Sequence, residues 1–197
     1  MRRTLYTIIF IFLLQNTVNA NEIEGKLQTF FATFVGHMND KNPQAVSNFL
    51  FENSDKDVEI RKKVIKLQNS STDLSNFTID ELTMDLTEYE LFIGAFFKGV
   101  SAYAINHKLT NFNYNTDDDT IFATVEYTEY ATVRKLDEES KRNIEIPVYI
   151  NSNCSYSFSN TTGLPRLYHN ICIEKIVRNE PKKPEKAEEL EDEFAKN

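Results

Sequence analysis

The most informative part of the sequence runs from Glu22 to Phe51 and reads EIEGKLQTFFATFVGHMNDKNPQAVSNFLF. Its first half repeats apolar residues at intervals of three and four, which places them on one side of a helix that must pack on a core. These residues are Ile23, Leu27, Phe30, Phe31, Phe34, Val35 and Met38. A polar turn then leads to Asn42 and Pro43, a pair typical of a helix start. Two helices joined by a tight turn are predicted.

A third helix is predicted after a polar loop at residues 69–76. Thr87 and Glu90 match a capping box, and Leu86 and Leu91 stand at the positions of a hydrophobic staple. From there, apolar residues recur at helical spacing as far as Ala104. The members of this stripe are Tyr89, Phe92, Ile93, Phe96, Phe97, Val100 and Ala104. We therefore expect a core helix that starts near Thr87.

Alternation of apolar and polar residues predicts strands in the rest of the chain. An irregular alternation among basic residues at 57–68 indicates an edge strand with a bulge. Residues 120–134 are apolar at most odd positions, where Glu129 is the exception, and residues 144–158 are apolar at even positions. A turn-forming stretch at 159–165 leads to a last strand at 166–177.

This order of elements resembles the nuclear transport factor 2-like, cystatin-like cone. The resemblance rests on the helical stretch quoted above, the third helix and the long strands that end in NICIEKIV, and it spans about residues 22–177. It implies an α+β fold in which three N-terminal helices pack on a strongly curved, mostly antiparallel sheet. The cone of that family leaves a cavity at its open end, which some members use for catalysis and others for binding partners.

No catalytic residue carries over from that family. Members that resemble ketosteroid isomerase place a tyrosine on the first helix, whereas the inward positions here are Phe30, Phe31 and Phe34. The His-Asp arrangement of dehydratase-like members has no counterpart either. No metal or cofactor is predicted, because Cys/His metal spacing, phosphate loops and nucleophile motifs are missing from the sequence.

Three residues remain as candidates for binding a ligand. Tyr127, Glu129 and His169 all lie at positions whose parity matches apolar neighbours, so we expect them to line one cavity. A carboxylate buried there titrates high. Alternatively, Glu129 is a satisfied buried polar residue, or a bulge turns it outward.

Two functions remain open on this evidence. The first is a non-catalytic module that binds a small apolar ligand or a protein partner, for example a subunit that resembles the periplasmic domain of the type IV secretion assembly factor. The second is a small cavity enzyme, of the isomerase, dehydratase or hydrolase type, that uses a buried carboxylate. The abundance of aromatic residues, 15 Phe and 9 Tyr, favours binding.

The N-terminus predicts export. A cationic start, an apolar run at residues 5–14 and Val18-Asn19-Ala20 match a signal peptide at 1–20 that is cleaved between Ala20 and Asn21. The apolar run is about half the 20 residues that a membrane-spanning helix needs, although an uncleaved anchor is the alternative. One domain is expected at 21–178, followed at 179–197 by a disordered charged tail rich in Pro, Lys and Glu.

Composition narrows the partners and the compartment. The net charge of -8 repels phosphate backbones, so nucleic acid is not expected as a partner, and no membrane contact is expected after cleavage. The short cationic start favours the periplasm of a Gram-negative bacterium, with extracellular secretion as the alternative. Asn-x-Ser/Thr triplets begin at Asn69, Asn76, Asn153 and Asn160, but chance produces nearly as many in so Asn-rich a chain.

Cys154 and Cys172 are predicted to form a disulfide, because an exported domain meets an oxidising environment. Gly163, midway between them, lies in the predicted turn, so a symmetric hairpin places the cysteines opposite each other. This register raises a conflict, however. Cys154 shares its parity with the apolar residues of its strand, whereas Cys172 has the opposite parity to Ile171 and Ile173. A bulge within one strand resolves the conflict.

Cleavage of the signal peptide is testable on protein recovered from its native compartment. We expect the intact mass to correspond to a chain that begins at Asn21, because the small residue Ala20 ends the recognised cleavage pattern. Mass spectrometry of the N-terminal peptide measures this directly. A chain that still begins at Met1 would support the membrane anchor instead.

Overall fold

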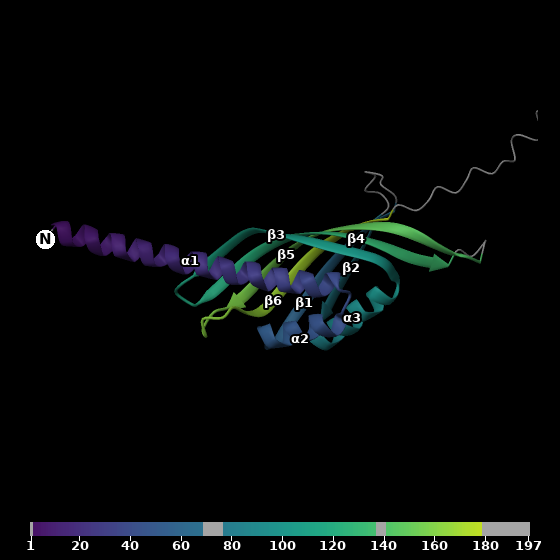
Figure 1. Cartoon of the computed structure of the whole chain (residues 1–197), viewed down its shortest axis with the longest axis horizontal. Coiled ribbons are helices and arrows are strands. Elements are labelled where there is room, and N and C mark those ends of the chain that lie inside the picture. Colours follow the sequence, from purple (N-terminus) through teal and green to yellow (C-terminus); the bar gives the residue numbers. More distant parts are fainter. Residues whose placement is uncertain (1, 69–76, 137–140, 179–197) are drawn as a thin grey trace, which may run out of the picture.

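The computed structural model describes residues 2–68, 77–136 and 141–178, and it describes side chains at residues 21–66, 79–136 and 141–177. Within these residues the elements are α1 (Arg2–Asn39), α2 (Pro43–Asn53), β1 (Ser54–Gln68), β2 (Phe77–Met84), α3 (Leu86–Lys98), β3 (Val100–Asn115), β4 (Thr120–Leu136), β5 (Asn143–Ser159) and β6 (Arg166–Arg178). The strands form one sheet in the order β2-β1-β6-β5-β4-β3, and every neighbouring pair described is antiparallel except β1 and β6. The helices gather on one side of this curved sheet (Figure 1). The predicted α+β class is confirmed.

The first two helices form as the sequence predicts. Leu27 and Phe31 of α1 are fully buried in the core, and Val46 of α2 is buried beside them. Asn42 caps α2, because its side-chain oxygen accepts a hydrogen bond from the backbone N–H of Ala45 at 3.0 Å. Apolar periodicity and capping chemistry therefore agree at this end of the chain.

The predicted signal peptide falls in the first half of α1, where side chains are not described, and the predicted tail at 179–197 lies outside the described residues. No helix within the described part of the chain combines the length and apolar character needed to span a membrane. Cleavage and the disordered tail stay predictions.

The third helix begins earlier than predicted. Asp85 caps it and forms the capping box with Glu88: the Asp85 carboxylate accepts from the Glu88 N–H at 2.7 Å, and the Glu88 carboxylate accepts from the Asp85 N–H at 3.1 Å. The capping box assigned to Thr87 and Glu90 is therefore wrong. The proposed staple fails as well, because Leu91 is 70% exposed.

The third helix also ends earlier than predicted. It stops at Lys98, where the Gly99 N–H donates to the Phe96 carbonyl at 3.0 Å. Val100 and Ala104, assigned to the helix, belong to strand β3. Their spacing of four residues continued the helical stripe by coincidence, because Val100 is buried in the strand whereas Ala104 is exposed.

Two strands, β2 and β3, were missed by the sequence analysis. Because β2 pairs with β1 on one side and β6 pairs with it on the other, the predicted edge position of β1 is wrong. The irregularity was predicted within 57–68, but β1 pairs with β6 without a shift from Glu59 to Gln68, and the register shift lies before it, between Ser54 and Glu59. The alternation in β2 is hard to read because it follows the polar stretch 69–76 and leaves Ile79 46% exposed.

Cys154 and Cys172 form the predicted disulfide and pair directly across β5 and β6. The predicted bulge is also confirmed, because Ser157 pairs with His169 and Phe158 with Leu167, which leaves Tyr168 as an extra residue in β6. Beyond this bulge the even-numbered residues of β6 face the core. The isoleucines at 171 and 173 accordingly lie on the outer face and are exposed.

Removal of the disulfide should destabilise the protein. The double variant Cys154→Ala/Cys172→Ala is expected to lose about 3 kcal/mol of unfolding free energy, because the bond restricts the unfolded chain across a separation of 18 residues. Urea unfolding of variant and oxidised wild type measures this loss. Equal unfolding midpoints would show that the bond contributes nothing.

Candidate ligand pocket

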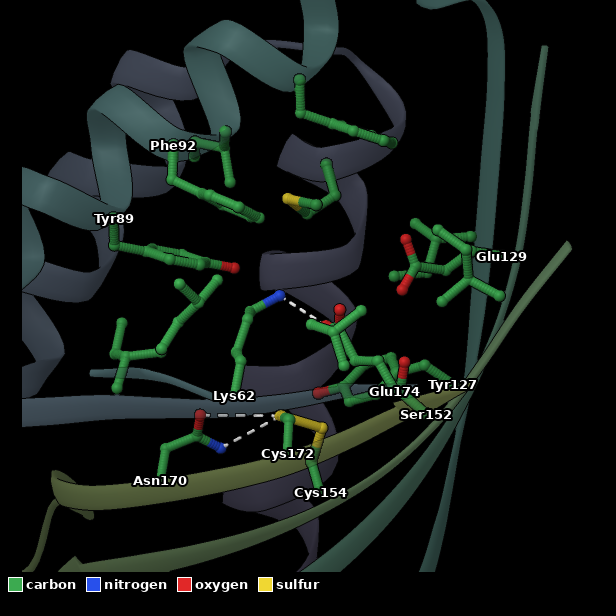
Figure 2. A pocket seen from close by; sticks show the side chains of 18 of the residues that line it. Lys62, Tyr89, Phe92, Tyr127, Glu129, Ser152, Cys154, Asn170, Cys172 and Glu174 are labelled. Carbon is green, nitrogen blue, oxygen red and sulfur yellow. Dashed lines mark hydrogen bonds and ion pairs between the residues drawn. A yellow bond between two sulfur atoms is a disulfide. The ribbon is translucent and has the colours of Figure 1, made fainter. Parts of the chain in front are cut away.

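A pocket of about 620 Å³ lies between the helices and the inner face of the sheet (Figure 2). Its helical wall is mostly aromatic and aliphatic, with Phe30, Phe34 and Met38 from α1 and Tyr89, Phe92, Ile93 and Phe96 from α3. Small-molecule sites occupy roughly 300–1,000 Å³ and are lined mainly by such side chains. Size and lining therefore fit a site for one small ligand.

The sheet contributes a row of polar side chains to this apolar cavity. Glu174 of β6 pairs with Ser152 of β5, which in turn pairs with Tyr127 of β4. All three lie on the inner face and line the pocket. Glu174 belongs to this row only because the bulge at Tyr168 has reversed the facing of β6.

Lys62 of β1 forms an ion pair with Glu174, with Nζ and Oε1 2.5 Å apart. The Lys62 ammonium also lies over the rings of Tyr89 and Phe92, 5.5 and 5.3 Å from their centroids. Burial is the largest single influence and lowers the pKa of Lys62, but the charge and hydrogen bond of Glu174 together with Tyr89 and Glu129 outweigh it, so the pKa lies above its ordinary value. Lys62 is therefore a permanent cation, held by a counter-ion and two aromatic rings.

Glu129 of β4 faces the same pocket. Its Oε2 accepts a hydrogen bond from the Tyr103 hydroxyl at 2.6 Å. The side chain is half-buried and lines the pocket. Burial raises the pKa of Glu129, and nearby Glu174 acts in the same direction, while Lys62 and the Tyr103 hydrogen bond oppose the rise. The carboxyl group thus holds its proton to a higher pH than an exposed glutamate.

Two hydroxyl features complete the polar lining. Tyr127 and Tyr156 share a hydrogen bond of 2.8 Å between their hydroxyl oxygens, and burial raises the pKa of both phenols, so both stay protonated. Ser152 is 5% exposed, and its Oγ forms no hydrogen bond of ordinary geometry among the described residues. It nevertheless lies close enough to the Glu129 carboxylate to lower that group's pKa slightly. The buried Ser152 hydroxyl can therefore still form a hydrogen bond with a ligand.

The structure brings two of the three candidate site residues together. Tyr127 and Glu129 both line the pocket, but His169 does not. His169 follows the bulge directly, so its side chain shares the parity of the exposed Ile171 rather than that of Asn170, which lines the pocket. The expected three-residue cluster is therefore incomplete.

Sequence reasoning missed Lys62, Ser152 and Glu174. A signal for Lys62 existed, because it shares even parity with the buried Val58, Ile60 and Val64, but the residue was read as part of a solvated basic cluster. Ser152 interrupts an otherwise apolar set of even positions in β5. Glu174 had no usable signal until the position of the bulge was known. No group of three or more His, Cys, Asp or Glu side chains in the described residues is arranged to hold a metal ion.

The helices, the curved sheet and the cavity between them define an NTF2-like, cystatin-like cone. A hexachlorocyclohexane dehydrochlorinase structure matches with a TM-score of 0.54 at 4% identity, covering 85% of this chain and 98% of that one. A ketosteroid isomerase-like protein from Erwinia carotovora atroseptica matches at 0.42 and 10% identity (75% and 92% covered). A cystatin-like domain of unknown function from Nostoc punctiforme matches at 0.46 and 10% (87% and 82%). At these identities the likeness concerns the fold alone.

No protein-family model matches the sequence, and no curated protein matches it. The recognition of the fold therefore rests on the arrangement of the elements.

The raised pKa of Glu129 predicts how Glu129→Gln depends on pH. In wild type, stability from this carboxyl group is fully present below its unfolded pKa of about 4.5 and is lost as the pH rises through the higher folded pKa. Gln does not ionise, so the variant should gain stability over wild type between about pH 4 and pH 8, by ~1.4 kcal/mol for each unit of pKa difference. Urea unfolding at both pH values measures the change.

The matched control is Glu126→Gln, which alters an exposed carboxylate on the same strand. Its stability relative to wild type should vary little across the same pH range. If the two variants showed the same pH dependence, Glu129 would not be a buried acid.

Proposed function

We propose that the mature chain is an exported binding protein that holds a small, mainly apolar ligand in this pocket. The observation that carries the proposal is a ligand-sized, aromatic-walled cavity whose polar groups are largely engaged with neighbouring side chains. Lys62 is paired with Glu174, Glu129 accepts from Tyr103, and Tyr127 is bonded to a second phenol. Such mutual pairing favours a rigid, preformed binding site, since a catalyst needs a group free to exchange protons with its substrate.

Two observations support export, and the periplasm of a Gram-negative bacterium is the compartment we propose. The two cysteines are bonded, which fits an oxidising compartment. The sequence also predicts a signal peptide at residues 1–20.

A second candidate function is a small cavity enzyme. Its support is the raised pKa of Glu129, because a carboxyl group tuned upward by burial can exchange a proton near neutral pH. The protonated phenols of Tyr127 and Tyr156 lie in the same pocket and could donate to an oxygen that gains negative charge. An enzyme of this kind would lose turnover in Glu129→Gln while still taking up its substrate.

Ligand uptake is testable with Nile red, a neutral apolar dye whose fluorescence rises in apolar surroundings. We expect the wild type to bind the dye, and Ile150→Trp, which fills the pocket from β5, to weaken binding at least about tenfold, or ~1.4 kcal/mol. Fluorescence titration gives both affinities.

The control is Tyr149→Trp, which adds an indole at the neighbouring residue on the outer face of the same strand, where Tyr149 is 44% exposed. This variant should bind the dye as the wild type does. Equal dye affinity in both Trp variants would place the dye outside the pocket and remove the main support for the proposal.

A further inference from the structure

The charges that line the pocket do not balance. Two lysines, Lys62 and Lys66, face four acidic residues, which are Asp80, Glu81, Glu129 and Glu174. Lys62 pairs with Glu174, Lys66 pairs with Asp80, and Glu81 pairs with Lys63 outside the lining. Glu129 forms no ion pair with the described residues, although Lys62 acts on it at longer range. The pocket therefore holds one carboxyl group that no ion pair neutralises when it is ionised.

The surroundings of Glu129 offer acceptors and aromatic rings. One carboxylate oxygen, Oε2, receives the Tyr103 hydroxyl, and Ser152 is the other described residue that acts on the carboxylate through a hydrogen bond. Ser152 Oγ, buried and without a regular partner, lies beside the carboxylate. Tyr103 packs against Phe96 and Tyr127 against Phe34, with ring centroids 5.6 and 6.3 Å apart. Free acceptors among aromatic rings are the surroundings that a cation prefers.

Lys62 is the cation that acts on Glu129, so it is the charge that would oppose a second cation there. Its ammonium points to Glu174, and Glu129 is set apart from that pair (Figure 2). Because Glu174 neutralises it and two rings cover it, Lys62 leaves the negative charge of Glu129 only partly compensated. An anionic ligand group, by contrast, would meet an acidic lining and bury another unpaired negative charge.

We propose that the ligand is an amphiphilic amine, whose ammonium group donates hydrogen bonds to Glu129 Oε1 and Ser152 Oγ while its apolar body fills the aromatic part of the pocket. This inference rests on the proposed binding function and names the chemistry of its ligand. The ammonium supplies a counter-charge for Glu129, and Ser152 Oγ accepts a hydrogen bond of regular geometry that the described residues do not give it.

The test uses the oxidised mature chain and three probes with the same alkyl chain: decylamine, decanol and decanoate, each below its micelle concentration. Displacement of Nile red gives the three affinities at neutral pH. We expect decylamine to bind at least about tenfold more tightly than decanol, and decanoate to bind most weakly. In Glu129→Gln the affinity for decylamine should fall to that for decanol, whereas the outer-face control Glu126→Gln should keep the preference for the amine.

The outcomes distinguish a failure of the amine proposal from a failure of the proposed binding function. If decanol or decanoate binds wild type as tightly as decylamine, or if Glu129→Gln keeps the preference, the amine proposal is overturned and the pocket remains a binding site for another class of ligand. If the dye binds but none of the three probes displaces it, the amine proposal is likewise overturned. If wild type binds no dye at all, the binding function itself fails. Far-ultraviolet circular dichroism and a urea midpoint establish that each variant is folded.

Discussion

One extra residue in the last strand, Tyr168, decides which side chains of β6 enter the molecule. Beyond it, Asn170, Cys172 and Glu174 turn inward. A regular strand would expose Glu174 and direct two isoleucines into the pocket. Lys62 would then be a buried ammonium without a counter-ion, a defect that costs about 3–5 kcal/mol when one partner of a buried pair is lost. The disulfide, the Lys62–Glu174 ion pair and the place of Glu174 in the pocket all depend on this single bulge.

The long alternating strands and the first two helices could be predicted from sequence because burial on one face imposes a period on the residues. The bulge itself was inferred from the disagreement between Cys172 and its isoleucine neighbours. The bulge also turns His169 away from the pocket, and the sequence-based placement of His169 did not take this into account. The third helix was extended too far because Phe96, Val100 and Ala104 are four residues apart, a spacing that a helix and a strand both accept.

The pocket residues were harder to predict for a different reason. Lys62 and Glu174 are each unfavourable inside a protein, and each is explained only by the other, across a parallel pairing of the first and last strands. No local pattern contains both partners. Glu129 could be found because its own strand marks it as an exception, but its missing counter-charge becomes visible only when every neighbouring charge has been paired off. The polar groups of the site are therefore explained by contacts between residues that are far apart in the sequence.

The parallel contact between β1 and β6 also governs the order in which the molecule can be assembled. Strands β3 to β6 follow one another and can pair as successive hairpins, whereas β1 must wait for the last strand of the domain. Until then β1 offers one unpaired edge, and Lys62 lacks its counter-ion. A nascent chain cannot complete the pocket while its C-terminal strand is still in the ribosome or a translocation channel. Completion of the sheet is thus a late event that needs the whole domain, and the edge of β1 stays open to wrong pairing until then.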